Sequence, residues 1–178
     1  MKFKIFLSTL IILIVNSCFC QTKDETQQWI LNKYKTFVPS EWVFELKKDR
    51  HTATQGIESN FSFVFLDEYF VFSSTMTTNY YEYEKFVRAT HEKSEWQIPI
   101  SEILYIKPNG MWAGRHILSF YTKTKSIKSV KEGNKIEALQ NEVGVPFTVI
   151  TDSLAERLTK AFANLKKYYS GNAAKELF

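Results

Sequence analysis

Apolar residues near the C-terminus recur every three or four positions, which predicts an amphipathic helix with one buried face. The spacing of Ser153 and Glu156 is that of a capping box, and Gly171 is suited to end the helix. Glu156 also stands four residues before Lys160, so that the two can form an ion pair on the exposed face. The predicted apolar stripe consists of Leu154, Leu158, Ala161, Phe162, Leu165 and Tyr168.

A second helix is predicted near the beginning of the chain. Asp24 or Thr26 can cap its first turn. Pro39 ends it, because the residue before a proline disfavours the helical region. The residues that share one face of this helix are Trp29, Ile30, Lys33, Tyr34 and Phe37.

Between the helices, residues 42–150 predict six to eight mostly antiparallel strands. Asp67-Glu68 is expected to form a turn. Pro108-Asn109-Gly110 is the clearest hairpin turn, because Asn-Gly accepts positive φ. The phase of the alternation slips at Ser101-Glu102, which indicates a bulge. The segments expected as strands are 42–47, 61–66, 69–76, 81–88, 98–106, 112–122 and 147–150.

This order of elements predicts a single α+β domain over residues 21–178. A sheet with one apolar face must be covered, and the C-terminal helix is available to cover it. Strands followed by a terminal helix resemble a pleckstrin-homology-like (PH-like) β-barrel, and residues 147–162 resemble the ends of small exported bacterial proteins. That resemblance implies no known activity. An open antiparallel α+β sandwich is the alternative to the barrel.

The N-terminal segment, Met1 to about Cys20, predicts a signal peptide. Lys2 and Lys4 precede an apolar run of signal-peptide length, which is shorter than the roughly 20 residues of a membrane span. We expect cleavage before Gln21 and export to the periplasm or the extracellular space. The alternative is a lipobox ending at Cys18, whose lipidation would anchor the protein to a membrane.

Composition changes this interpretation at three points. Aromatic residues make up 16% of the chain, which favours strands. Both cysteines, Cys18 and Cys20, lie in the predicted leader, so the mature protein would have no disulfide, no cysteine-bound zinc and no cysteine nucleophile. Without Lys2 and Lys4 the net charge of +4 falls to +2, which gives no support for nucleic-acid binding.

The sequence contains no catalytic motif. His51, His91 and His116 have no second ligand at metal-binding spacing, and no serine stands between two glycines. Glu82 and Glu84 would share one face of a strand, where we interpret them as solvated. We therefore expect no cofactor and no metal, and we lean towards a function without catalysis.

Trp112, Arg115 and His116 form the densest group of recognition-type residues. Tryptophan and arginine dominate binding hot spots. The other interpretation is that Trp112 packs under the Asn-Gly turn while Arg115 and His116 alternate outwards.

A second candidate is a run of lysines that includes Lys123, Lys125 and Lys128. Such a run could bind an anionic surface. Lysines at period two also protect edge strands from pairing with other chains, and we favour that explanation.

The leading hypothesis is an exported, monomeric, non-enzymatic binding or accessory domain. Its partner would be an envelope component, a peptide or another protein. The alternative is a carrier of lipids or small molecules, which would need a continuous apolar cavity; a filled core at that place would argue against it. The residues expected to line that cavity are Phe61, Phe63, Phe65, Phe70 and Phe72.

Overall fold

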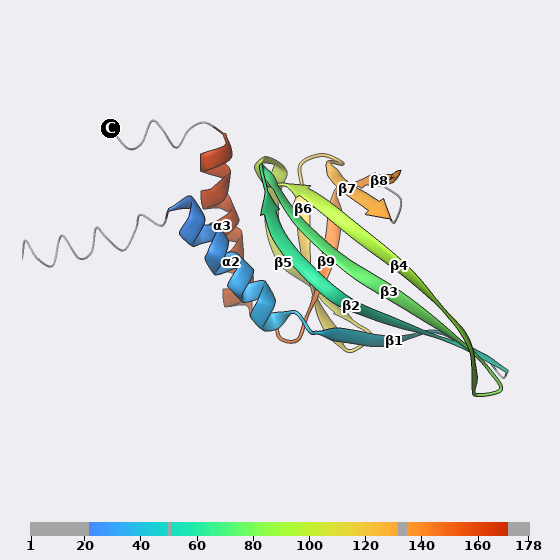
Figure 1. The fold of residues 1–178 in the computed structure, drawn as a ribbon. Coiled ribbons are helices and arrows are strands. Elements are labelled where there is room, and N and C mark those ends of the chain that lie inside the picture. Colours follow the sequence, from blue (N-terminus) through green and yellow to red (C-terminus); the bar gives the residue numbers. More distant parts are fainter. Residues whose placement is uncertain (1–21, 50, 132–134, 171–178) are drawn as a thin grey trace, which may run out of the picture.

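The structure is a computed structural model that describes residues 22–49, 51–131 and 135–170. Figure 1 shows the α+β arrangement that the sequence predicts, with both helices beside the strands. In chain order the elements are α2 (Lys23–Phe37), β1 (Glu41–Lys48), β2 (Thr52–Leu66), β3 (Tyr69–Glu82), β4 (Lys85–Pro99), the short 3₁₀ helix η1 (Ile100–Glu102), β5 (Ile103–Trp112), β6 (Arg115–Thr122), β7 (Ile127–Lys131), β8 (Lys135–Gln140), β9 (Glu142–Phe147) and α3 (Asp152–Tyr169).

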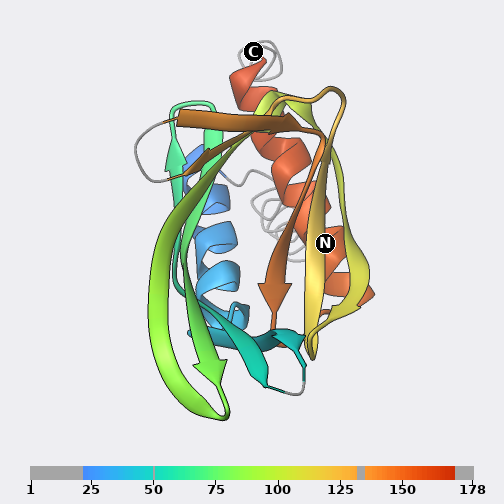
Figure 2. The ribbon, with the colours of Figure 1, turned by 90° about the vertical axis from the view of Figure 1, so that its right-hand side faces the viewer.

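The strands form two antiparallel sheets, a larger one in the order β1-β2-β3-β4-β7-β8 and a smaller one in the order β5-β6-β9. Among the described residues no ladder joins the sheets, so the strands do not close into a barrel. The other form of the prediction, antiparallel sheets covered by the C-terminal helix, is the one observed. The chain passes between them at η1, which interrupts the segment that the sequence predicts as one strand over 98–106. In Figure 2 the two sheets stand in front of both helices.

The helices cover one part of the sheets, and the aromatic core lies beneath them. The predicted C-terminal stripe is confirmed, since Leu158 and Leu165 are fully buried and Phe162 nearly so. The ring of Phe162 lies 5.2 Å from that of Phe70 on β3 and 5.4 Å from that of Phe120 on β6. One helix thus packs against both sheets at once. Tyr168, at the end of the stripe, is only partly buried.

Both helices begin at a threonine rather than at the predicted caps. In α3 the hydroxyl of Thr151 accepts a hydrogen bond from the backbone of Leu154, so the cap lies two residues before Ser153. In α2 the capping box is formed by Thr22 and Glu25 instead of Asp24 or Thr26. Glu156 and Lys160 do form their ion pair, at 2.7 Å. Gly171 lies outside the described residues.

Two hairpin turns differ from the prediction. Tyr83 and Glu84 have positive φ and connect β3 to β4, so the predicted strand over 81–88 is wrong and Glu82 and Glu84 share no strand face. The β5–β6 turn is formed by Ala113 and Gly114, at φ of 45° and 76°. The Asn109-Gly110 pair instead lies inside β5, at an irregularity in the ladder. The turn at Asp67 is confirmed by the pairing of Leu66 with Tyr69, whereas the last strand ends at Phe147 rather than running over 147–150.

The strands β2, β3 and β4 have 14 or 15 residues each and extend well beyond the smaller sheet (Figure 1). At about 3.3 Å per residue they measure roughly 50 Å. Their far end is fastened to the β1–β2 turn. The backbone N–H of Tyr83 donates to the carbonyl of His51 at 2.7 Å, and the two rings are 4.9 Å apart.

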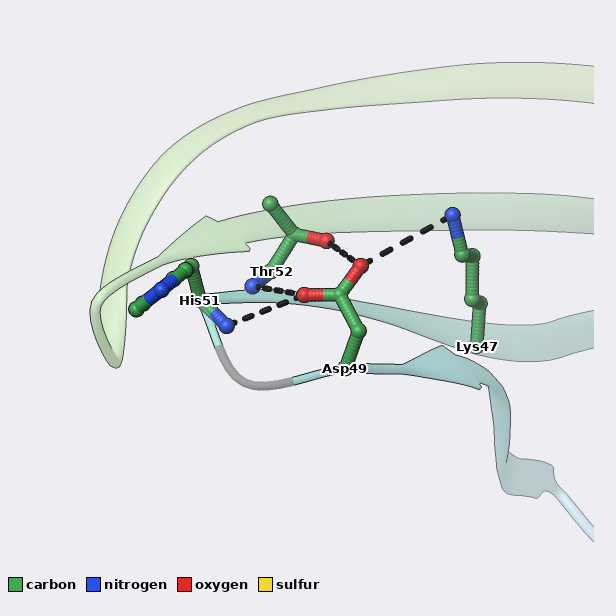
Figure 3. A network of polar contacts seen from close by, with 4 residues as sticks. All are labelled: Lys47, Asp49, His51 and Thr52. Carbon is green, nitrogen blue, oxygen red and sulfur yellow. Dashed lines mark hydrogen bonds and ion pairs between the residues drawn. The ribbon is translucent and has the colours of Figure 1, made fainter.

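Asp49 closes that β1–β2 turn (Figure 3). Its carboxylate accepts hydrogen bonds from the Thr52 hydroxyl at 2.6 Å and from the backbone of His51 and Thr52 at 2.9 and 2.7 Å. Lys47 adds an ion pair at 3.7 Å. These hydrogen bonds, that of the Thr52 side chain foremost, hold the pKa of Asp49 well below its usual range. These contacts of Lys47, Asp49, His51 and Thr52 stabilise the turn, and we assign the four residues a structural role.

Candidate functional site

The candidate site is a pocket of about 470 Å³ between the larger sheet and the strands β6 and β9. Three of the four tryptophans of the chain line it: Trp42 from β1, Trp96 from β4 and Trp112 from β5. Two carboxyl groups, Glu58 on β2 and Glu92 on β4, share the lining. The smaller sheet contributes Ile117, Gly144 and Pro146 from β6 and β9.

The register of the larger sheet places these groups on one face. Trp42 pairs with Glu58, Glu58 with Met76, and Met76 with Glu92, so four strands contribute one row of side chains. Directly paired residues point to the same side of a sheet. Along β3 this face carries Phe70 and Phe72 beneath the helices and Ser74 and Met76 in the pocket. One end of this sheet face therefore belongs to the core, and the other end lines the pocket.

A bulge in β2 decides which residue of that strand faces the pocket. Three steps on β2, from Ser59 to Ser62, oppose two steps on β3, and Asn60 in between has a φ of 55°. Because successive side chains alternate between faces, the extra residue reverses the phase of the strand. Glu58 consequently faces the pocket. Without the bulge Ser59 would occupy that face.

The tryptophans differ in how tightly they are held. Trp42 is only 3% exposed; its indole N–H donates to the carbonyl of Ala113 at 3.1 Å, and its ring meets that of Trp112 at 4.6 Å. Trp96 stacks on Phe72 at 4.5 Å. Trp112 also contacts Phe44, yet remains 52% exposed. The indole of Trp42 is thus fixed and buried, that of Trp96 is stacked and partly buried, and that of Trp112 is half exposed.

Glu58 is a partly buried carboxyl whose environment disfavours its charge. Burial raises the pKa of Glu58, and the hydrogen bond from the Ser74 hydroxyl at 2.5 Å opposes that rise only in part. Glu92 differs, since Lys131 forms an ion pair with it at 2.9 Å. Neither lysine nor arginine occurs among the residues that line the pocket. The described part of this pocket is therefore acidic, with one of its two acids left without a basic partner.

The raised pKa of Glu58 predicts a particular dependence of stability on pH. Its folded pKa lies above the unfolded value near 4.5, so the stability that the protonated carboxyl contributes is present below that value and is lost as pH rises through the folded pKa. Glu58→Gln should remove this loss, which amounts to about 1.4 kcal/mol for each unit of elevation. Urea unfolding of both proteins at pH 4 and pH 7 measures it. An identical change with pH in wild type and Glu58→Gln would contradict the prediction; the titration of Asp49 and Glu156 is common to both.

No family model, curated protein or solved structure matches this chain. The candidate site therefore depends on geometry alone. In the part of the chain that the structure describes, no helix is long and apolar enough to cross a membrane. The predicted leader, including Cys18, lies outside the described residues.

Of the first predicted cluster, only Trp112 lines the pocket. Arg115 is its cross-strand neighbour at the β5–β6 turn and is partly buried, but it is not among the lining residues. His116 pairs with Met111 on one side and Phe147 on the other. Trp112 packs against Trp42 and Phe44 beside the β5–β6 turn and still leaves 52% of its surface exposed.

The predicted lysines lie apart from the pocket. Lys123 and Lys125 are exposed in the connection from β6 to β7, and Lys128 on β7 places its ammonium 5.2 Å from the centre of the Tyr69 ring. Their interpretation as edge-strand protection is wrong, since the first two lie outside any strand and β7 runs between β4 and β8. The anionic-surface hypothesis for them stays a prediction.

The histidines do not come together. His91 shares a hydrogen bond of 2.9 Å with Thr77, and His51 lies at the strand tips beside Tyr83. Among residues 22–49, 51–131 and 135–170, no three potential ligands are grouped so that they could hold a metal ion.

The apolar cavity that a carrier would need is filled by aromatic rings. Phe70 and Phe72 are at most 1% exposed, and Phe63 and Phe65 pack against them at 5.1–6.2 Å. Phe61 and Phe63 border an open groove beside α2 instead. Of the residues predicted to line a carrier cavity, Phe70 and Phe72 thus belong to the core and Phe63 and Phe65 pack against it, whereas Phe61 does not.

Sequence reasoning missed Trp42, Glu58 and Trp96. One signal was available: Glu92, Ser94 and Trp96 alternate along one strand face, a polar face ending in an indole. Trp42 and Glu58 could not be assigned in this way, because their position depends on the β2 bulge and on contacts between distant strands.

Proposed function

We propose that this protein is an exported, non-enzymatic binding domain whose ligand occupies the pocket between the two sheets. The observation that carries the proposal is the convergence of Trp42, Trp96 and Trp112 from three separate strands on one hollow. Tryptophan is enriched in binding hot spots, and a concave site with a few polar groups is the common form of a ligand pocket. The predicted leader supports the exported location.

The chemistry of the pocket favours binding over catalysis. Among the described residues, its lining combines carboxyl, hydroxyl and amide groups with aromatic rings, and none of these lining residues is a histidine that could serve as a base for Ser74 or Ser94. Glu58 and Ser74 hydrogen-bond to each other, which positions an acceptor for a ligand. As part of the proposal, the order of strands followed by a terminal helix supports kinship with exported PH-like proteins, although the two sheets stay open. We propose that this domain acts as a monomer on an envelope component, a peptide or another protein.

Substitution of the exposed indole tests the proposal. Trp112→Ala should lower ligand affinity at least tenfold, about 1.4 kcal/mol, because it removes a wall of the pocket, while the half-exposed position limits the loss of stability. The measurement is equilibrium dialysis of the purified protein against a small-molecule extract of its source cells, with mass spectrometry of the compounds that it enriches.

Met111→Ala is the matched control, since Met111 is the neighbouring residue, is 64% exposed and is not part of the pocket lining. It should enrich the same compounds as wild type. The proposal is wrong if wild type enriches nothing, or if Trp112→Ala enriches the same compounds equally well.

A further inference from the structure

We infer that the ligand is a small organic ammonium cation, held against the tryptophan rings of the pocket with Glu58 as its counter-ion. The inference deepens the proposed function and depends on it. It follows from three properties of the same site: the sign of its charge, the missing partner of one carboxyl and the type of its aromatic surface.

The charge of the lining sets the sign of the ligand. Both ionisable groups in the lining are acids, Glu58 and Glu92, and Asn109, Ser74 and Ser94 provide its neutral polar groups. An anionic ligand would meet the like charge of Glu58, which no basic residue of the described lining offsets. A cation meets the opposite charge, and the low-dielectric walls of the pocket strengthen that attraction.

Glu58 lacks the partner that a buried carboxylate normally has. Charges removed from water are usually paired. Within the described residues the polar contact of this carboxyl is the hydroxyl of Ser74, which donates to Oε1. Glu92 already has Lys131, and Glu142 nearby accepts hydrogen bonds from Asn109 and Tyr121 at 2.8 and 2.7 Å. A ligand ammonium would give Glu58 the cationic partner that Glu92 has in Lys131.

The aromatic surface fits the same group. A cation over an indole face is attracted by the ring quadrupole, and tryptophan is the strongest of the aromatic residues in this respect. Trp42 and Trp96 are fixed by Phe44 and Phe72, so their rings are already in place before a ligand enters. The volume of about 470 Å³ suits a small molecule.

A neutral sugar is the competing ligand, because sugars also stack on indoles and donate hydrogen bonds to carboxyl groups. A sugar carries no charge, so two probes that share one shape and differ in charge show whether the charge of the ligand drives binding. Choline carries the quaternary ammonium; 3,3-dimethylbutan-1-ol has the same shape without the charge.

The experiment is a titration of the full mature protein, followed by tryptophan fluorescence, with choline, 3,3-dimethylbutan-1-ol and glucose as probes. Choline should bind with a Kd of about 1 mM or tighter, and both neutral probes at least tenfold more weakly. Nα-acetyl-lysine amide forms a fourth arm. Tighter binding of choline indicates a free small molecule as the source of the ammonium, and tighter binding of the lysine derivative indicates a side chain of a partner.

Two substitutions refine the test. Glu58→Gln should weaken choline binding at least tenfold, because it removes the counter-ion and keeps the shape. Glu45→Gln is the matched control and should bind choline like wild type, since Glu45 is exposed on β1 and is not part of the pocket lining. Trp29→Phe should leave the fluorescence change in place, because Trp29 lies on α2 and is not part of the lining.

The inference is overturned if choline gives no response, if the neutral isostere binds equally well, or if Glu58→Gln binds choline like wild type. Failure of this kind leaves the proposed function intact as long as dialysis against the extract still shows enrichment that Trp112→Ala abolishes. Loss of both results would remove the pocket itself as a binding site.

Discussion

Phe70→Ala is expected to lower the free energy of unfolding by about 3–5 kcal/mol, a large share of the roughly 5–15 kcal/mol that a domain of this kind has. Phe70 is fully buried. Its ring lies 5.1 Å from Tyr34 on α2, 5.6 Å from Phe120 on β6 and 5.2 Å from Phe162 on α3. One side chain therefore joins both helices to both sheets, and its removal leaves a cavity that no single element can close.

Urea unfolding followed by far-ultraviolet circular dichroism measures this change. Val64→Ala is the control, because Val64 lies on neighbouring β2 but is 47% exposed, so its loss should cost no more than about 0.5 kcal/mol. A loss below about 1 kcal/mol for Phe70→Ala would contradict close packing of the four rings.

Trp42→Ala is expected to be nearly as severe, at about 3–5 kcal/mol, and also to abolish ligand binding. Trp42 is buried between Phe44 and Trp112, and its indole N–H satisfies the carbonyl of Ala113 in the β5–β6 turn. Truncation leaves that carbonyl without its donor and removes the support of Trp112. Because Trp42 belongs to β1 and Trp112 to β5, the contact also holds the two sheets together at the mouth of the pocket.

Comparing Trp42→Ala with Trp112→Ala distinguishes a tryptophan that stabilises the fold from one that only contacts the ligand. Both variants should lose binding in the dialysis experiment, but only Trp42→Ala should show a large shift in the urea midpoint. Equal midpoints for Trp42→Ala and wild type would refute the role of Trp42 as the link between the sheets.

The C-terminal helix could be predicted because its 3.6-residue spacing is strong and coincides with burial in the structure. Its first residue could not, because Thr151 and Ser153 both have a hydroxyl that can accept from the first turn. Which of the two caps the helix depends on how the chain arrives from β9, and this is a tertiary property.

The β3–β4 and β5–β6 turns could not be predicted for a different reason. Tyr83, Glu84 and Ala113 adopt positive φ, which their residue types rarely favour. Asn109-Gly110 has the better turn sequence and nevertheless lies inside β5, at an irregularity of the ladder. The pairing of β5 with β6 along the whole ladder thus outweighs the local turn preference of Asn109-Gly110.

Only part of the pocket could be predicted from the sequence. Trp112 stands out by residue type, and the structure places it in the lining. Arg115 and His116 share that signal but remain outside. Glu58 reaches the pocket because one extra residue near Asn60 reverses the phase of β2, and the period-two pattern alone does not show where such a residue is inserted.

One face of β3 changes from core residues to pocket residues along the strand, and this has a consequence for how the protein can evolve. Phe70 and Phe72 hold the domain together, whereas Met76, four positions beyond Phe72, lines the pocket and is only partly buried. A substitution at Met76 can alter what is bound at little cost in folding. Selection can therefore diversify the ligand while the scaffold stays constant, a freedom that a site built within the core would not have.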